Sequence, residues 1–171
     1  MGNSQNPEET KKRYDELLQM MMPVYYIDKP MDSEMLSTAK KTWESVAKDT
    51  GRHFKQLKKD PDFKYDTCIN YFNDIFFVRL FDVHPMSKVL FHKSNSKQEK
   101  ASQNKFLARM LTMALLDIDD QSRWDLTFTK LAEMHNEMGV KAVEYGVIGE
   151  ILFWTLEKCV GEEVFTVDVP M

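Results

Sequence analysis

Two predicted helices joined by a glycine, over residues 124–158, constrain the fold of this chain more than any other feature. In the first half, residues recur at every third or fourth position, as they do on one face of an α-helix. They are Trp124, Phe128, Leu131, His135 and Met138. Gly139 follows directly and suits the left-handed residue that ends many helices. The second half repeats the spacing at Tyr145, Ile148, Leu152, Leu156 and Cys159.

His135 is the one imidazole on an otherwise apolar stripe. Two interpretations apply to a histidine in such a place. It is either a core residue with one ring nitrogen hydrogen-bonded or a metal ligand, and a lone histidine is weak support for a metal. The surrounding sequence therefore has to decide between them.

The composition favours a single, mostly helical domain with an extension. The chain has 171 residues, 43% of them hydrophobic and 11 of them Phe, with only 6 Gly and 6 Pro, so it can form a substantial apolar core. The net charge of −4 gives no basic surface for nucleic acid. Cys68 and Cys159 form no disulfide framework, and we expect two buried thiols in a reducing compartment, the cytoplasm.

The sequence predicts neither a transmembrane helix nor a signal peptide. No apolar run is long enough for a transmembrane helix, and no signal-peptide core is present. Gly2 matches the first requirement of a myristoylation signal, but Asn6 stands where Ser or Thr is needed; the alternatives are an ordinary terminus and a lipid anchor. Residues 1–32 are predicted to be an extension with a short helix over 8–22, which Pro23 ends.

Residues 33–171 are predicted to form the main domain. Ser33 suits an N-cap, and a helix follows it. The charged connector 48–65 is long enough for an inserted turn or short helix. A strong helix is expected over 66–83, Pro85 is placed to begin the next one, and another apolar helical face runs from Phe106 to Leu115.

Two stretches carry a family likeness. One is the pattern around His135, LAEMH followed by GVK and YGVIGEIL over 131–152. The other is FVRLFDVHPMSKVLF over 77–91. Together they resemble the globin family, most closely the globin domain of flavohaemoglobins and its single-domain relatives. The resemblance implies an all-α globin fold that binds haem b, with His135 as the axial iron ligand. An open site above the iron would take oxygen or another diatomic gas, such as CO or NO.

The resemblance also assigns the haem cavity residue by residue. Phe91, six residues after Pro85, is expected to pack flat against the haem. Phe77, eight residues before Pro85, is expected on the distal wall above the iron. Gln103 falls at the distal polar position and Leu107 at the distal apolar one, with the register open by about a residue. The remaining cage is expected from Leu111, Leu131, Val140 and Ile148.

The proximal side is expected to involve more than the histidine. Tyr145 and Glu150 resemble family residues beside it, and a backbone carbonyl one turn back is expected to fix its tautomer. His84 and His92 are reserve ligands if the distal loop folds in. Gly146 and Gly149 cost helix propensity, so we expect them to allow close helix approach.

The chain departs from the family in two places. Flavohaemoglobins carry a tyrosine where this chain has Phe77, which weakens a nitric-oxide dioxygenase interpretation. After Gly161 only ten residues follow, so the last (H) helix is predicted to be missing or incomplete. The face of Ile148, Ile151, Leu152 and Trp154 would then need cover from the N-terminal extension, a second copy or a partner.

Three functional hypotheses follow. The first is a globin that reversibly binds a gas for transport, storage or sensing. The second is an enzyme, nitric-oxide dioxygenase. The third is a globin-fold interaction module that lacks productive haem binding.

Overall fold

The computed structural model of the chain describes residues 6–21, 23, 26, 30, 32–91, 107–115, 121–137 and 139–162. In these ranges the regular structure is entirely helical, which confirms the all-α prediction. The helices are α1 (Pro7–Met21), α2 (Ser33–Ala47), α3 (Arg52–Leu57), α4 (Cys68–Val83), α5 (Ser87–Phe91), α7 (Gln121–Glu137) and α8 (Ala142–Val160). Residues 107–115 are also helical.

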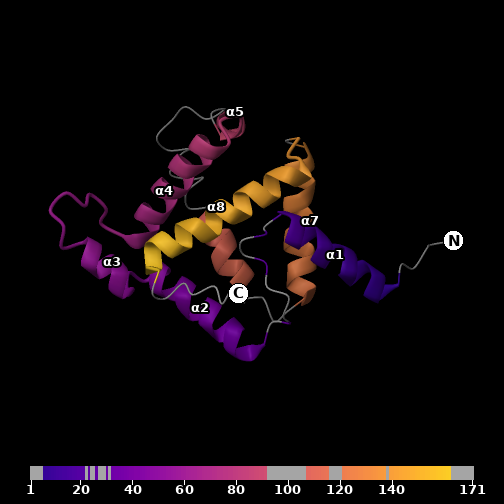
Figure 1. The fold of residues 1–171 in the computed structure, drawn as a ribbon, viewed down its shortest axis with the longest axis horizontal. Coiled ribbons are helices and arrows are strands. Elements are labelled where there is room, and N and C mark those ends of the chain that lie inside the picture. The colour runs from indigo at the N-terminus through magenta and orange to yellow at the C-terminus, as the bar shows by residue number, and fades with distance from the viewer. Residues whose placement is uncertain are drawn as a thin grey trace.

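Helix α8 is the centre of the fold, and α1, α2, α3 and α4 all pack against it (Figure 1). Its closest neighbour is α4, which runs antiparallel to it. Cys68 at the start of α4 contacts Cys159 near the end of α8. At the other end, His84 is the residue directly after α4. Its Nε2 lies 3.9 Å from Oε1 of Glu144, which is in the first turn of α8.

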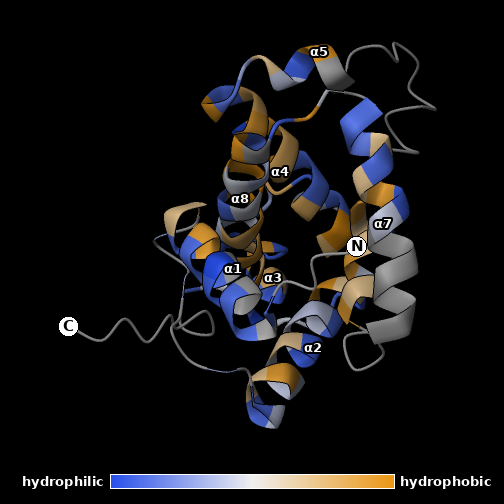
Figure 2. Cartoon of the chain, turned by 90° about the vertical axis from the view of Figure 1, so that its right-hand side faces the viewer, coloured by the Kyte–Doolittle hydropathy of each residue, from blue (hydrophilic) through white to orange (hydrophobic). Residues whose placement is uncertain are grey.

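The core consists of two neighbouring clusters along α4. In the first, Trp43 of α2 packs edge-on against Phe72, with ring centroids 5.5 Å apart. The second contains Phe76, Leu80 and Ile151. Leu107 and Leu152 pack against both clusters and so join them. Long hydrophobic stretches run along α4 and α8 in Figure 2, whereas α1 is largely hydrophilic.

The helices begin close to the positions that the sequence predicted. The N-cap of α2 is Asp32, whose carboxylate accepts from Met35 N at 2.8 Å; the expectation of Ser33 was wrong by one residue, because the carboxylate is the stronger acceptor at a helix N-terminus. Thr67 caps α4 through Asn70 N. The short helix predicted in the connector is confirmed as α3.

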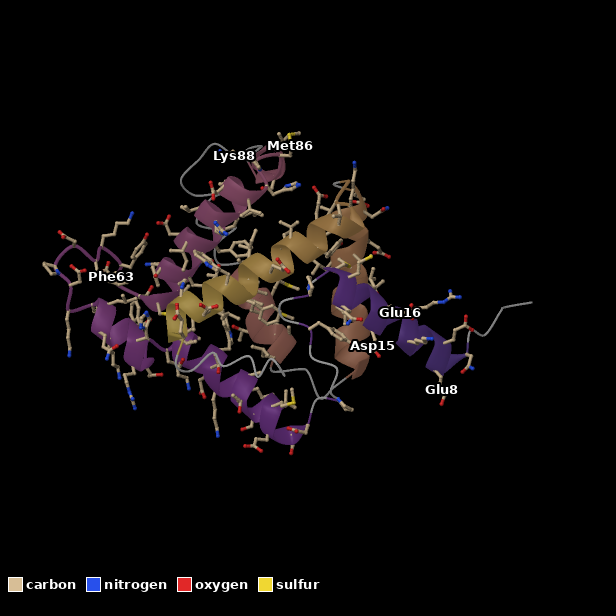
Figure 3. The ribbon with its side chains drawn as sticks, viewed as in Figure 1. Glu8, Asp15, Glu16, Phe63, Met86 and Lys88 are labelled. Carbon is tan, nitrogen blue, oxygen red and sulfur yellow. The ribbon has the colours of Figure 1, made fainter. Side chains whose placement is uncertain are left out.

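Helix α1 packs closely on the first turns of α8. A Cβ atom built on Gly146 would lie 2.8 Å from the carbonyl oxygen of Met21 and 3.0 Å from its Cβ. The expectation that Gly146 permits close helix approach is therefore confirmed. Glu8 and Glu16 of α1 are exposed, and Figure 3 shows them along this helix as it extends from the body of the molecule.

The face of α8 that was expected to lack cover is largely covered by the chain itself. Ile151 is buried, and Ile148 and Leu152 pack against the second cluster. The guanidinium of Arg79 lies over the Trp154 ring, 5.3 Å from its centroid. The predictions about the H helix and about Gly2 concern residues outside the described ranges. Among the described helices, none is long and apolar enough to cross a membrane.

Candidate functional site

His135 and Tyr145 are brought together by the turn between α7 and α8. Gly139 has a φ of 78°, the left-handed conformation predicted for it, and the Val140 amide donates to the carbonyl oxygen of His135 at 2.9 Å. The chain then reverses. Helix α8 begins at once because the Glu144 carboxylate accepts from the Lys141 amide at 2.6 Å, which satisfies one of the free N–H groups at the helix start.

This reversal sets Tyr145 beside the imidazole that precedes it by ten residues. Tyr145 Oη lies 2.9 Å from His135 Nδ1, within hydrogen-bond distance, and the ring centroids are 5.5 Å apart. The partner of Nδ1 in the structure is thus a tyrosine hydroxyl, where a backbone carbonyl was expected. Among the described residues, none hydrogen-bonds to His135 Nε2.

The electrostatics of the site favour a neutral imidazole. Burial of the half-covered ring lowers the pKa of His135 below its ordinary value, because desolvation disfavours the charged form. A depressed pKa in the folded state stabilises the fold above the unfolded-state pKa, and that contribution is lost as the pH falls through the folded pKa. At neutral pH the histidine therefore offers a lone pair, as a metal ligand requires.

Three of the residues predicted to line the haem cavity share one apolar cluster. This is the second core cluster, made by Phe76, Leu80 and Ile151. The predicted residues that pack against it are Phe77, Leu107 and Ile148. The rings of Phe76 and Phe77 meet edge-on, with centroids 5.3 Å apart. Helix α4, the 107–115 segment and α8 thus place these three side chains around a common apolar centre.

The other predicted site residues are distributed more widely. Leu111 packs against the first core cluster, beside Trp43 and Phe72. Leu131 and Val140 are partly buried near the α7–α8 turn. The side chain of Phe91 and the whole of Gln103 and His92 lie outside the described residues, so their predicted roles stay predictions.

His84, named above as a reserve ligand, is the C-cap residue of α4. Its Nε2 faces Glu144, so it pairs the end of α4 with the first turn of α8. Sequence reasoning did not find this pair, because the two residues are sixty positions apart and no local pattern connects them. It also missed Asn73 in α4 and Thr155 in α8, which are two buried polar residues.

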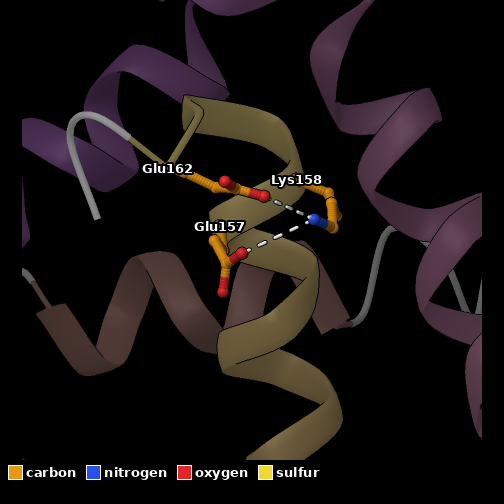
Figure 4. A network of polar contacts seen from close by, with 3 residues as sticks. All are labelled: Glu157, Lys158 and Glu162. Carbon is orange, nitrogen blue, oxygen red and sulfur yellow. Dashed lines mark hydrogen bonds and ion pairs between the residues drawn. The ribbon is translucent and has the colours of Figure 1, made fainter. Parts of the chain in front are cut away.

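A charged cavity of about 630 Å³ lies elsewhere, between α3 and the end of α8. It is lined by Arg52, His53, Gln56, Glu157, Lys158, Val160, Gly161 and Glu162. Lys158 Nζ lies 3.2 Å from a Glu162 carboxylate oxygen and 3.5 Å from one of Glu157 (Figure 4). The hydrogen bond that Lys158 donates to Glu162 is the largest cause that raises the pKa of Lys158. These opposite charges compensate one another, as on a solvated surface.

Comparison with known proteins identifies the family. A family model described as Globin matches residues 74–169, more than half of the 171-residue chain. The chain belongs to the globin family, as its resemblance had predicted.

Among curated proteins, a flavohemoprotein from Rhizobium meliloti (strain 1021) is 26% identical over 87 residues. The aligned segment covers 51% of this chain and 21% of that protein, so the chain matches about a fifth of the relative's length. No solved structure matches the chain.

Proposed function

We propose that this globin binds haem b through His135 and reversibly binds oxygen or another diatomic gas at the iron. The observation that carries the proposal is the 2.9 Å contact between His135 Nδ1 and Tyr145 Oη. For Nε2 to donate its lone pair to iron, the ring proton must reside on Nδ1, which then donates to the Tyr145 hydroxyl oxygen. Such a contact fixes the tautomer and orientation of a metal-ligating histidine.

The remaining residues fit the same group. The lowered pKa of His135, caused by burial of the ring, keeps the imidazole neutral. The cluster that includes Phe77, Leu107 and Ile148 supplies apolar surface, and burial of porphyrin surface contributes roughly 25 cal/mol per Å². When bound, the haem supplies the iron at which a diatomic gas binds. The protein residues hold the ring and exclude water around it.

Phe77 bears on what kind of gas chemistry the site supports. Its side chain has no hydrogen-bond donor, so a gas on the distal side receives no hydrogen bond from this position. This favours reversible gas binding over nitric-oxide dioxygenation. Turnover of nitric oxide in the presence of oxygen and a reductant tests the enzymatic alternative directly. We also propose a cytoplasmic location, which the two free thiols of Cys68 and Cys159 support.

The decisive experiment is reconstitution with haemin, followed by reduction and exposure to carbon monoxide. We expect a sharp Soret band that shifts with carbon monoxide in the wild-type chain and in His84→Ala. The same band should weaken strongly in His135→Ala. His84 is a matched control because it also lies close to the end of a helix but faces Glu144.

Two outcomes would contradict the proposal. A broad spectrum of free haemin in all three proteins would leave a globin-fold interaction module as the better interpretation. Equal spectra of the three proteins with a sharp Soret band would show that haem binds through a ligand other than His135.

A further inference from the structure

The antiparallel pairing of α4 and α8 fixes which of their residues lie level with each other. Cys68 contacts Cys159 at one end, and His84 lies 3.9 Å from Glu144 at the other. Residues 68–84 of one segment therefore run alongside residues 159 back to 144 of the other, which are seventeen and sixteen residues. By this register Asn73, five residues after Cys68, lies level with residues 154–155 of α8.

Thr155 is the residue at this level that faces α4. Residues four apart share one face of a helix, so Ile151, Thr155 and Cys159 form a single stripe on α8. Both neighbours in the stripe pack on α4, since Ile151 belongs to the cluster with Phe76 and Cys159 contacts Cys68. Thr155, which is fully buried, must then face the stretch of α4 between these two contacts.

Asn73 is the buried polar residue in that stretch, and the hydrogen bonding of its side chain is incomplete. Its side chain is only 2% exposed, and its Oδ1 is buried without a hydrogen-bond partner. The Thr155 hydroxyl donates to the Ile151 carbonyl oxygen at 2.7 Å, but its oxygen can still accept a hydrogen bond. The interface thus holds two acceptor oxygens with spare capacity. Buried polar groups in native proteins are normally satisfied by the protein or by an ordered water.

We propose that Asn73 and Thr155 bind an internal water molecule between α4 and α8. The water donates one hydrogen to Asn73 Oδ1 and the other to Thr155 Oγ1, which gives it the two polar partners that a buried water requires. The site selects a small neutral molecule with two donors. A cation of similar size, such as ammonium, would bury a charge in an interface whose other described residues are mostly apolar.

The position of this site matters for the haem cavity but does not depend on haem. Phe77, predicted for the distal wall, follows Asn73 by one helical turn on the same side of α4. Phe77 itself offers no polar atom. The bound water therefore provides a polar group one turn behind an otherwise apolar wall.

Oxygen-17 magnetic relaxation dispersion of the full chain tests the proposal, because it counts long-lived internal waters whether or not haem is bound. We expect Asn73→Leu to lose the contribution of one such water, and Thr155→Val to lose or weaken it. Asn70→Leu is the matched control, because Asn70 lies on the exposed face of the same helix; it should keep the wild-type amplitude. An unchanged amplitude in folded Asn73→Leu overturns the proposal.

A second measurement covers the case in which Asn73→Leu does not fold. In the wild-type chain, the side-chain amide protons of Asn73 should show magnetisation transfer from a bound water. Their complete lack of such transfer, with the amide signals assigned and sharp, also overturns the proposal. Failure of haem reconstitution would leave both measurements readable, so the two proposals are tested separately.

Discussion

The contact between α1 and α8 makes a quantitative prediction for Gly146→Ala. The alanine Cβ is rigidly attached to α8 and would lie 2.8 Å from the Met21 carbonyl oxygen, 3.0 Å from its Cβ and 3.3 Å from its Cα. Two of these three atoms belong to the backbone of α1, so no side-chain rotation relieves the overlap. Helix α1 must move by several tenths of an ångström, and its packing on α8 is disturbed.

Two opposing free-energy terms set the size of the effect. Overpacking of a close contact costs about 1–3 kcal/mol. Replacement of glycine by alanine inside a helix returns about 1 kcal/mol through propensity. In the full chain the net change in unfolding free energy is then a loss of roughly 0–2 kcal/mol. In a chain that starts at residue 31 and lacks α1, only the propensity remains, and the substitution should stabilise by about 1 kcal/mol.

Urea denaturation of the four proteins, with and without α1 and with glycine or alanine at 146, measures both terms. The difference between the two backgrounds is the energy of the contact, as in a double-mutant cycle. We expect it to be about 1–3 kcal/mol, with protection from hydrogen exchange reduced in α1 of the full-length variant. An equal effect of Gly146→Ala in both backgrounds would refute the reasoning.

Three further predictions concern single side chains. Tyr145→Phe removes the hydrogen-bond partner of His135 Nδ1. In the haem-bound protein we expect a lower iron–histidine stretching frequency by resonance Raman and about tenfold weaker haem retention. An unchanged stretching frequency would contradict a role for this contact. Burial, followed by the hydrogen bond to Asp74, raises the pKa of Tyr65 to about 12. The folded state favours the protonated Tyr65 hydroxyl. This group therefore stabilises the fold below its unfolded-state pKa of about 10, and the stabilisation is lost as the pH rises through about 12. Asp74→Asn should lower the pH midpoint at which tyrosinate absorbance appears. A hydrogen bond within the thiol pair, together with burial, raises the pKa of Cys159, so iodoacetamide should modify it only in urea, and labelling of the native protein in a mass spectrum would contradict this.

The sequence predicted the elements of the fold because their signals are local. Apolar residues at helical spacing located α4, α7 and α8, and Gly139 marked the turn that the structure shows in the left-handed conformation. The resemblance around His135 predicted the family, which the family match confirmed. The one wrong cap, Ser33 in place of Asp32, differs by a single position, since neighbouring residues there can both accept from the first turn.

The partners of buried polar groups could not be predicted in this way. The contact of His84 with Glu144 and the level positions of Asn73 and Thr155 join segments that are distant in the sequence. They depend on the antiparallel register of α4 and α8, which is set by packing of whole helix faces. The sequence by itself determined which residues form helices and that His135 lies on an apolar stripe. The resemblance placed Tyr145 beside this histidine, but only the tertiary structure decided that the tyrosine hydroxyl meets Nδ1. It alone also decided that the Asn73 amide is buried one helical turn from Phe77, because such contacts arise when separate helices come together.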